Sequence, residues 1–449
     1  MKREIYEHII RLLRACIAGT DFEGHAYAVG GCVRDRRLSN EIKDIDLVVD
    51  FPNGGIELAK FMKDGGYVKG SPVVYENYGT VMFRLREYPD IEIEAVQTRK
   101  EDYHDAKTRN PVTCFGTIED DCRRRDFTIN ALYYDISADR EIDFNGNSLF
   151  DLGAKVIDTC GDPEIIFDED PLRILRAVRF AARLGYTISD RTKEGMKRFA
   201  YRLEIISQER ITDEFNKILS GPNPEAGMEM LCDFGLLIYV LPESTFPVMS
   251  RVGYVKAGMH RVAMMAKRYD VDQLLPELTY LSTLTDRDAF RNAMIRMKYS
   301  NEMTDKVHLY AELQDMLDEA AYPVSKPAMH AAEYRAKTME NYKVAFVVHK
   351  AESFNSEIPL HWPKLDPREP HPMLGYRLPV DGNDVMELLG IPPGPEVKKT
   401  LDALLREAFR NPDITRDECI ALILKKKDKD NDETGENQGV VRTRLPHSG

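Results

Sequence analysis

The chain has 449 residues, which at roughly 150 residues per domain predicts about three structural units. Apolar residues make up 43% and charged residues 31%, a balance typical of a globular protein with a sizeable core. The formal net charge is −13, from 62 Lys and Arg against 75 Asp and Glu. This excludes a protein that coats nucleic acid through bulk positive charge, so any such contact must come from local basic patches.

The seven cysteines are scattered and form no Cys-x-x-Cys pair, which predicts reduced thiols rather than a disulfide framework or a zinc site. Charged residues at Glu7, Arg11 and Arg14 interrupt the N-terminal segment, and no apolar stretch reaches 18 residues. We therefore expect no signal peptide, no membrane contact and a cytoplasmic location.

The first part of the chain has the pattern of a mixed α/β fold. Residues 1–20 show the apolar spacing of an amphipathic helix, and residues 26–29, 45–49 and 91–96 are predicted strands. Helical patterns then predominate from Asp170, which with the proline that follows has the form of a helix start. The sequence thus predicts a small mixed sheet with helices, followed by an all-helical body.

The end of the chain has a different composition. Residues 363–379 are rich in proline and predict a connector, and residues 383–424 predict a last pair of helices. Residues 425–449 contain too few apolar side chains to offset the entropy of ordering, so this segment is predicted to be disordered.

Two carboxylates, Asp44 and Asp46, alternate with apolar residues in a predicted strand. Side chains at i and i+2 leave a strand on the same face, and two carboxylates so close repel unless a cation lies between them. Oxygen ligands in this arrangement suit Mg²⁺. Glu94 on a later strand could complete the site, although a solvated position on the strand explains Glu94 equally well.

A strand that runs into Gly30-Gly31 lies ten residues upstream of the carboxylates, with Arg34 close behind it. Glycines let the backbone approach a polyphosphate, and the following N–H groups together with an arginine can bind it. An ordinary turn is the alternative explanation.

Arginines form two further clusters. Residues 123–125 are three consecutive arginines before an apolar segment, where they need anions or acids as partners; ion pairs with residues 119–121 are the alternative to phosphate binding. The helix that starts after Asp170 carries a second set on one face, opposite an apolar face formed by Ile174, Leu175, Val178, Ala181 and Ala182. We call this set the arginine face: Arg173, Arg176, Arg179 and Arg183.

The motifs occur in the order G-G-x-V-R-D, D-x-D, R-R-D-F-T-x-N-A, E-D-P-x-R-x-x-R-x-x-R-F and E-R-I. In this order and spacing they resemble the class II tRNA nucleotidyltransferases, the family of CCA-adding enzymes and bacterial poly(A) polymerases within the polymerase-β-like superfamily. The resemblance covers residues 26–222 and, more weakly, residues 378–395.

The resemblance implies an α/β nucleotidyltransferase head, a small mixed sheet with helices, followed by an all-α body. It places the catalytic head at residues 1–145, a helical nucleotide-binding neck at 146–222, a helical body at 223–362, a helical C-terminal tail domain at 363–424 and a disordered tail at 425–449.

The resemblance also implies roles for individual residues. Asp44 and Asp46 would be catalytic and hold two Mg²⁺ ions, with Glu94 as a further ligand; one ion would activate the attacking 3′-hydroxyl and the other would stabilise the pyrophosphate leaving group. Asp126 would contact the ribose. The full set of implied nucleotide-binding residues is Gly31, Arg34, Arg124, Arg125, Asp126, Asn130, Asp170, Arg173, Arg176 and Arg179.

Asp170 and Arg173 would read the incoming base, and hydrogen-bond chemistry supports this independently. Cytosine and adenine both present a ring-nitrogen acceptor beside an amine donor, which an Asp acceptor and an Arg donor match. Uracil and guanine present the opposite pattern there. One Asp/Arg pair therefore admits C and A and excludes U and G.

The implied activity is addition of C, C and A from CTP and ATP to the 3′ end of tRNA, with contacts to the acceptor stem, no template and no obligate protein partner. A poly(A) polymerase is disfavoured because residues 70–81 lack the G-[RK]-[RH]-F-x-[LIV]-x-H element. A CC-only enzyme is disfavoured because residues 99–111 retain a full loop, although CC-only and A-only forms stay open. A catalytically silent RNA-binding protein is the alternative from another class. No His-Asp pair follows His260, so we expect no phosphohydrolase activity.

Overall fold

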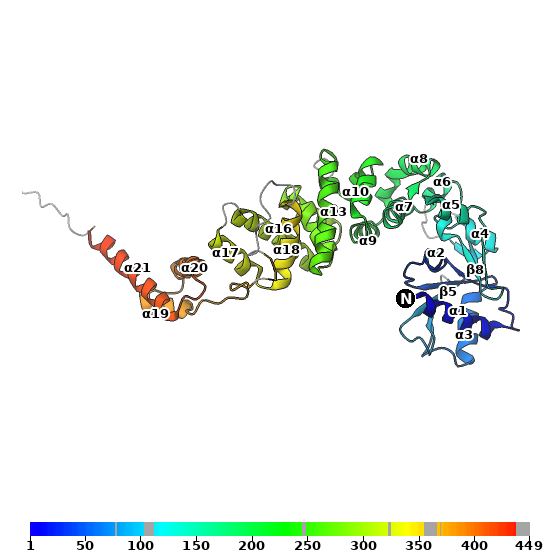
Figure 1. Cartoon of the computed structure of the whole chain (residues 1–449), viewed down its shortest axis with the longest axis horizontal. Coiled ribbons are helices and arrows are strands. Elements are labelled where there is room, and N and C mark those ends of the chain that lie inside the picture. Colours follow the sequence, from blue (N-terminus) through cyan, green and yellow to red (C-terminus); the bar gives the residue numbers. More distant parts are fainter. Residues whose placement is uncertain are drawn as a thin grey trace, which may run out of the picture. The chain divides into compact units, whose positions relative to one another are not determined.

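The computed structural model describes residues 1–76, 79–102, 112–244, 248–321, 325–353, 366–368 and 370–436. The chain divides into two compact units, Met1–Thr245 (unit 1) and Phe246–Gly449 (unit 2). Unit 1 contains the predicted mixed sheet and unit 2 is helical (Figure 1). The predicted α/β head followed by a helical body is therefore confirmed.

Unit 1 is built on a sheet whose described strands run in the order β3-β4-β5-β2-β1-β8-β9. Strands β2 and β5 are parallel, whereas every other neighbouring pair in this order is antiparallel. The bounds are β1 Ala26–Val29, β2 Ile45–Val49, β3 Val73–Tyr75, β4 Thr80–Arg84, β5 Glu92–Gln97, β8 Tyr133–Asp135 and β9 Arg140–Ile142.

The two faces of this sheet have different coverings. Helices α1 (Arg3–Ile17) and α3 (Gly54–Asp64) bury one face, where Leu47 of β2 joins their apolar side chains. On the other face Val48 packs with residues of α4 (Ile118–Arg123). Because side chains alternate along a strand, Asp46 shares the α4 face with Val48.

The strand register places a row of side chains across the α4 face. Val29 lies opposite both Tyr133 and Asp46, and Asp46 in turn lies opposite Glu94. The sheet therefore brings residues that are far apart in sequence into one line, with two carboxylates on adjacent strands.

Helices and two small strand pairs complete unit 1. Strands β6 (Arg99–Asp102) and β7 (Val112–Phe115) form an antiparallel pair, and β10 (Val156–Ile157) lies parallel to β11 (Thr187–Ile188). The remaining helices are α2 Gly31–Arg37, η2 Thr128–Asn130, α5 Ser148–Ala154, α6 Pro163–Glu169, α7 Leu172–Leu184, α8 Asp190–Phe199, η3 Ala200–Ile205, α9 Gln208–Leu219, α10 Pro224–Asp233, α11 Leu237–Val240 and η4 Pro242–Ser244.

Helix α7 forms as the sequence predicts. The Asp170 carboxylate accepts a hydrogen bond from the Leu172 N–H at 3.2 Å, which satisfies a free donor at the helix start, and Gly185 ends the helix with a φ of +68°. All five residues of the predicted apolar face are buried. The opposite, arginine-bearing side of α7 faces residues of several other elements.

Unit 2 consists of packed helices. Helix α16 packs against α14, α17 and α18, with a core that includes Leu313, Leu317 and Phe346. The bounds are α13 Val252–Tyr269, α14 Leu274–Thr283, α15 Arg287–Arg296, α16 Asn301–Ala321, α17 Lys326–Ala336 and α18 Met339–Ser353.

The C-terminal helices differ from the predicted pair. The described residues form three helices there, α19 (Gly382–Leu389), α20 (Pro395–Arg410) and α21 (Arg416–Glu436), because Gly390, with a φ of +70°, ends the first. Helix α21 also extends into the segment predicted to be disordered from residue 425. Lys426 donates to Glu396 at 2.8 Å and so ties this extension to α20; residues 437–449 lie outside the described residues.

Within the described ranges, every helix is too short or too polar to cross a membrane.

Candidate active site

The predicted carboxylates lie together on the α4 face of the sheet. Asp44 directly precedes β2, and Asp46 and Glu94 are register partners on β2 and β5. Burial and the neighbouring charges of Asp44 and Glu94 raise the pKa of Asp46 to about 7. Burial also raises the pKa of Glu94, and the Asp44 and Glu92 charges add to it against the opposing effect of Arg99. Such mutual repulsion is what a bound divalent cation would relieve.

The case for a metal ion at these carboxylates rests on their charge and not on a preformed coordination geometry. The described residues contain no group of three or more His, Cys, Asp or Glu side chains already arranged around a metal position. The donors are hard carboxylate oxygens, which fit Mg²⁺. The chemistry of the donor set thus fits the implied ion, with Asp44 and Asp46 as the pair and Glu94 beside Asp46.

The turn before α2 lies against the carboxylates. Gly30 has a φ of +77°, and a Cβ added to it would be 3.6 Å from Asp46 Oδ2 and 3.9 Å from Arg125 Nη1. A carboxylate and a guanidinium therefore approach the same bare stretch of backbone. Arg34, in contrast, is only 2% exposed and pairs with Asp35 at 2.8 Å and with Asn130. A phosphate could reach Arg34 only after these partners release it.

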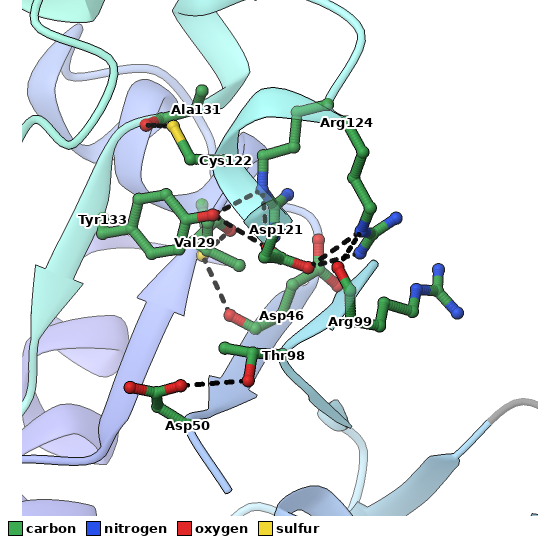
Figure 2. Close-up of polar contacts among 12 residues, drawn as sticks. Val29, Asp46, Asp50, Thr98, Arg99, Asp121, Cys122, Arg124, Ala131 and Tyr133 are labelled. Carbon is green, nitrogen blue, oxygen red and sulfur yellow. Dashed lines mark hydrogen bonds and ion pairs between the residues drawn. The ribbon is translucent and has the colours of Figure 1, made fainter. Parts of the chain in front are cut away.

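Two arginines of the triplet, Arg124 and Arg125, are held by one buried acid, Asp121. Figure 2 shows Asp121 with Arg124 and Tyr133. Asp121 has no exposed side-chain surface, and it accepts hydrogen bonds from Arg124, Arg125 and the Tyr133 hydroxyl. Although burial opposes ionisation, Arg125 and Arg124 hold the pKa of Asp121 at about 2. The alternative of ion pairs with residues 119–121 is thus correct for these two arginines, but the pairs are buried rather than on the surface.

Asp126 is paired in a similar way. Its Oδ2 accepts from Arg176 Nε and Nη2 at 2.9 and 2.6 Å, and its Oδ1 accepts from the Phe127 N–H and the Asn130 amide. Burial opposes ionisation, but Arg176 and Asn130 hold the pKa of Asp126 at about 2. A ribose hydroxyl would therefore have to replace one of these hydrogen bonds.

The arginine face of α7 is not the open basic surface that the sequence suggests. Each arginine has an acidic partner from another part of the chain or from the preceding helix. The pairs are Arg173 with Glu169 at 3.0 Å, Arg176 with Asp126 at 2.6 Å, Arg179 with Glu214 at 2.7 Å and Arg183 with Asp35 at 3.6 Å. The arginines therefore join α7 to the head and to α9 in this state of the protein.

Asp170 and Arg173 lie one helical turn apart at the start of α7. Asp170 uses Oδ1 to cap the helix and Oδ2 to bind Arg210 at 2.9 Å. Arg173 donates to Glu169 and, through Nη2, to the Arg124 carbonyl at 2.8 Å. The structure thus supports the helix-cap role of Asp170 and fixes Arg173 in place, but it shows no direct bond between the two side chains.

Sequence reasoning missed most of the partners that hold this site together. Tyr133, Asp35 and Glu214 were not identified as candidates, because each is an ordinary residue of its own local segment. Asp35 lies inside the G-G-x-V-R-D motif, which was the one available signal. The loop predicted at 99–111 begins in β6, but residues 103–111, including His104 and Asp105, lie outside the described residues.

Comparison with known proteins agrees with these motifs. A family model described as the poly A polymerase head domain matches residues 26–158, and one described as the probable RNA and SrmB-binding site of polymerase A matches residues 185–246. A CCA-adding enzyme of Geobacillus sp. (strain WCH70) is 28% identical over 389 residues, which cover 85% of this chain and 88% of that protein. Along most of its length the chain is therefore similar to CCA-adding enzymes.

Further CCA-adding enzymes are similar to this chain in sequence or fold. The CCA-adding enzyme of Oceanobacillus iheyensis is 39% identical over 218 residues, 48% of this chain and 50% of that protein. The Bacillus stearothermophilus CCA-adding enzyme in complex with CTP superposes with a TM-score of 0.70 at 23% identity, over 96% of this chain and all of that one. The Thermotoga maritima CCA-adding enzyme complexed with tRNA gives 0.65 at 21% identity, over 94% and 95% of the two chains. These two likenesses show that the fold is shared.

Proposed function

We propose that this chain adds C, C and A to the 3′ end of tRNA from CTP and ATP, without a nucleic-acid template and with release of pyrophosphate. The observation that carries the proposal is the approach of Asp46 Oδ2 and Arg125 Nη1 to the backbone of Gly30. A carboxylate that can hold a cation and a guanidinium that can hold a phosphate thereby meet at one turn. Relatives named as CCA-adding enzymes along most of the chain support the choice of reaction.

The carboxylates are proposed to hold the metal. Asp44 and Asp46, with Glu94 beside them, would bind two Mg²⁺ ions. When bound, Mg²⁺ would favour ionisation of the attacking 3′-hydroxyl and offset charge on the pyrophosphate leaving group. The apolar face of β2 keeps the strand fixed against α1 and α3, so the two aspartates are presented at a defined spacing.

The cationic residues are proposed to hold the nucleotide. Arg125, whose Nη1 atom lies at the Gly30 turn, would bind a phosphate there. Arg124 lies next to it and pairs with the same carboxylate, Asp121. Asp126 would contact the ribose, and Asn130 holds the Asp126 carboxylate from one side. The other proposed nucleotide-binding residues are Gly31, Arg34, Asp170, Arg173, Arg176 and Arg179.

Asp170 and Arg173 are proposed to select the base. Asp170 offers an acceptor to the amine of C or A, and Arg173 offers a donor to the ring nitrogen. The contacts of Arg173 with Glu169 and with the Arg124 carbonyl would hold its guanidinium in one orientation. A rigid donor penalises U and G more strongly than a mobile one, because it cannot rotate away from the mismatched N–H.

The same proposal extends to the organisation of the chain. It includes the division into head, neck, body, tail domain and tail, with boundaries at residues 145, 222, 362 and 424. It also includes binding of the tRNA acceptor stem. A cytoplasmic location and independence from a partner protein stay predictions.

The experiment is an extension assay on a tRNA transcript that ends at its discriminator base, with Mg²⁺, CTP and ATP. The proposal expects a product three nucleotides longer and three equivalents of pyrophosphate per tRNA. A long adenosine tract from ATP alone would instead identify a poly(A) polymerase. Binding of tRNA without any extension would identify a catalytically silent RNA-binding protein.

A further inference from the structure

Asp121 is the most deeply buried carboxylate near the candidate active site. Its side chain has no exposed surface, although it lies on the short helix α4 beside the arginine triplet. A buried carboxylate is costly unless charged or polar donors surround it. Asp121 is surrounded in this way, and all of its donors come from residues of the candidate active site or of the sheet beneath it.

The two oxygens of Asp121 serve different arginines. Oδ1 accepts from Arg124 Nε at 3.1 Å and from Arg124 Nη2. Oδ2 accepts from Arg125 Nε at 3.2 Å, from Arg125 Nη2 at 2.8 Å and from the Tyr133 hydroxyl at 2.8 Å. Each guanidinium is thus held side-on by its Nε and Nη2 atoms, and Tyr133 fixes the carboxylate from the sheet.

This geometry decides which way Arg125 points. With Nε and Nη2 occupied by Asp121, the remaining nitrogen, Nη1, is directed to within 3.9 Å of the position that a Cβ on Gly30 would take. The guanidinium of Arg125 also makes a cation–π contact with Tyr133, whose ring centroid lies 5.3 Å from the guanidinium carbon. Arg125 is therefore oriented by Asp121 on one side and by an aromatic ring on the other.

Arg124 is held by the same carboxylate and connects two further parts of the site. Its Nε also donates to the Arg99 carbonyl at 3.1 Å, where β6 begins, and its own carbonyl accepts from Arg173 at 2.8 Å. Asp121 thereby fixes a residue that contacts both the root of the β6–β7 hairpin and the proposed base-reading arginine.

We propose that Asp121 is a positioning residue of nucleotide transfer: it holds Arg124 and Arg125 so that the free edge of Arg125 faces the triphosphate at the Gly30 turn. This inference rests on the proposed function, because it takes the Gly30 turn as the place where the triphosphate binds. A purely structural role for Asp121, as a buried ion pair that stabilises α4, is the competing explanation.

Asp121→Asn tests the proposal. Asn offers one acceptor oxygen, which can serve only one of the two arginines, and its amide group faces the donors of the other. The probes are ATP and AMP in the presence of Mg²⁺, measured by equilibrium binding on the full chain. Wild-type protein should bind ATP more tightly than AMP, and Asp121→Asn should lower the ATP affinity about tenfold or more while it leaves the AMP affinity unchanged.

Matched variants separate this result from a folding defect. Asp135→Asn changes another buried carboxylate of the same sheet, one that accepts only backbone N–H groups of Ser137 and Ala138, and should leave both affinities unchanged. Tyr133→Phe removes the hydroxyl that donates to Asp121 at 2.8 Å and accepts from Arg125 Nε at 3.0 Å, but it keeps both arginines on Asp121. It should therefore weaken ATP binding less than Asp121→Asn does.

Two results would overturn the proposal. One is an Asp121→Asn protein that melts cooperatively and keeps the wild-type preference for ATP over AMP. The other is an equal loss of ATP and AMP affinity, which a structural role predicts. A wild-type protein that does not distinguish ATP from AMP would count against the proposed function itself, before any variant is compared.

Discussion

At the scale of single residues, the candidate active site depends on Asp46. It is the carboxylate that lies in register with Glu94, follows Asp44 on the same face, and approaches the Gly30 turn. Burial and the charges of those two acids raise its pKa against the opposing effect of Arg125, so negative charge is concentrated at this position. The side chain is part of neither apolar cluster, and the larger of the two lies on the opposite face of β2.

We expect Asp44→Ala or Asp46→Ala to abolish nucleotide addition and to leave the melting temperature and tRNA affinity nearly unchanged. Loss of an essential group usually costs at least ~100-fold in rate. Steady-state incorporation of labelled CTP measures the effect, and Asp64→Ala, an exposed acid of α3, is the control. Activity above about 10% of wild type in either variant would remove these residues from the mechanism.

A second prediction concerns Asp170, which caps α7 and is proposed to read the base. Asp170→Asn keeps a capping oxygen but replaces the second acceptor by an amide donor, so misincorporation of U and G should rise while addition of C and A falls. Single-nucleotide incorporation with each of the four nucleotides measures this ratio. Asp162→Asn is the matched control, because Asp162 caps α6 through the Glu164 N–H at 2.9 Å. If Asp170→Asn still rejects U and G as wild type does, Asp170 is only a helix cap and does not read the base.

At the scale of elements, the arginine face of α7 changes the expectation for tRNA binding. An exposed basic face would contact tRNA phosphates, whereas the structure pairs each of these arginines with an acid.

Arg183→Gln tests whether the arginine face contacts tRNA phosphates, and it leaves Asp35 paired with Arg34. Loss of a phosphate contact would reduce the slope of log affinity against log salt by about 0.7–0.9. We expect this slope, measured by filter binding, to stay within about 0.3 of wild type. A reduction close to a full phosphate contact would contradict the internal pairing.

Among the helices of unit 2, Glu352 is a buried carboxyl group whose raised pKa links stability to pH. Glu352 on α18 accepts from Gln314 on α16 and from Thr283 on α14 at 3.3 Å, and burial together with the Asp318 charge raises its pKa to about 7. A carboxyl with a raised pKa in the folded state stabilises the protein fully below its unfolded pKa, and this contribution is lost as the pH rises through the folded value. Between the ordinary glutamate pKa of 4.5 and the raised pKa of about 7, the loss of stability is on the order of 3 kcal/mol.

Glu352→Gln should therefore be more stable than wild type near pH 8 and lose that advantage near pH 5. Urea unfolding at the two pH values measures the difference. Glu340→Gln, an exposed position on the same helix, should show no such change. A pH-independent difference between Glu352→Gln and wild type would show that Glu352 does not titrate in this range.

Local patterns predicted the elements better than they predicted the contacts between them. Strand β2 and the apolar face of α7 follow from short-range apolar patterns alone, because both elements bury most of their apolar side chains. The partners of the arginines could not be predicted in this way. Glu214 and Asp35 lie far from Arg179 and Arg183 in sequence, and only the folded chain brings them together. The extension of α21 past residue 424 likewise depends on a contact with α20.

At the scale of the whole molecule, the candidate site is composed of residues from most of the length of unit 1. The sheet supplies the carboxylates, the segment from Asp121 to Asn130 supplies the phosphate and ribose contacts, and the start of α7 supplies the proposed base readers. The net charge of −13 is therefore compatible with a nucleotide-binding site, since the arginines that form it are concentrated and neutralised locally.

The most direct test of the central claim is a stepwise extension experiment. The protein is incubated with Mg²⁺, one labelled nucleotide at a time, and tRNA that ends at the discriminator base, at the first C or at the second C. We expect C to be added to the first two substrates, A to be added only to the third, and U and G to be rejected throughout. Addition of A to the discriminator base, or extension of the third substrate by further C, would contradict the proposal that this chain alone builds the CCA end.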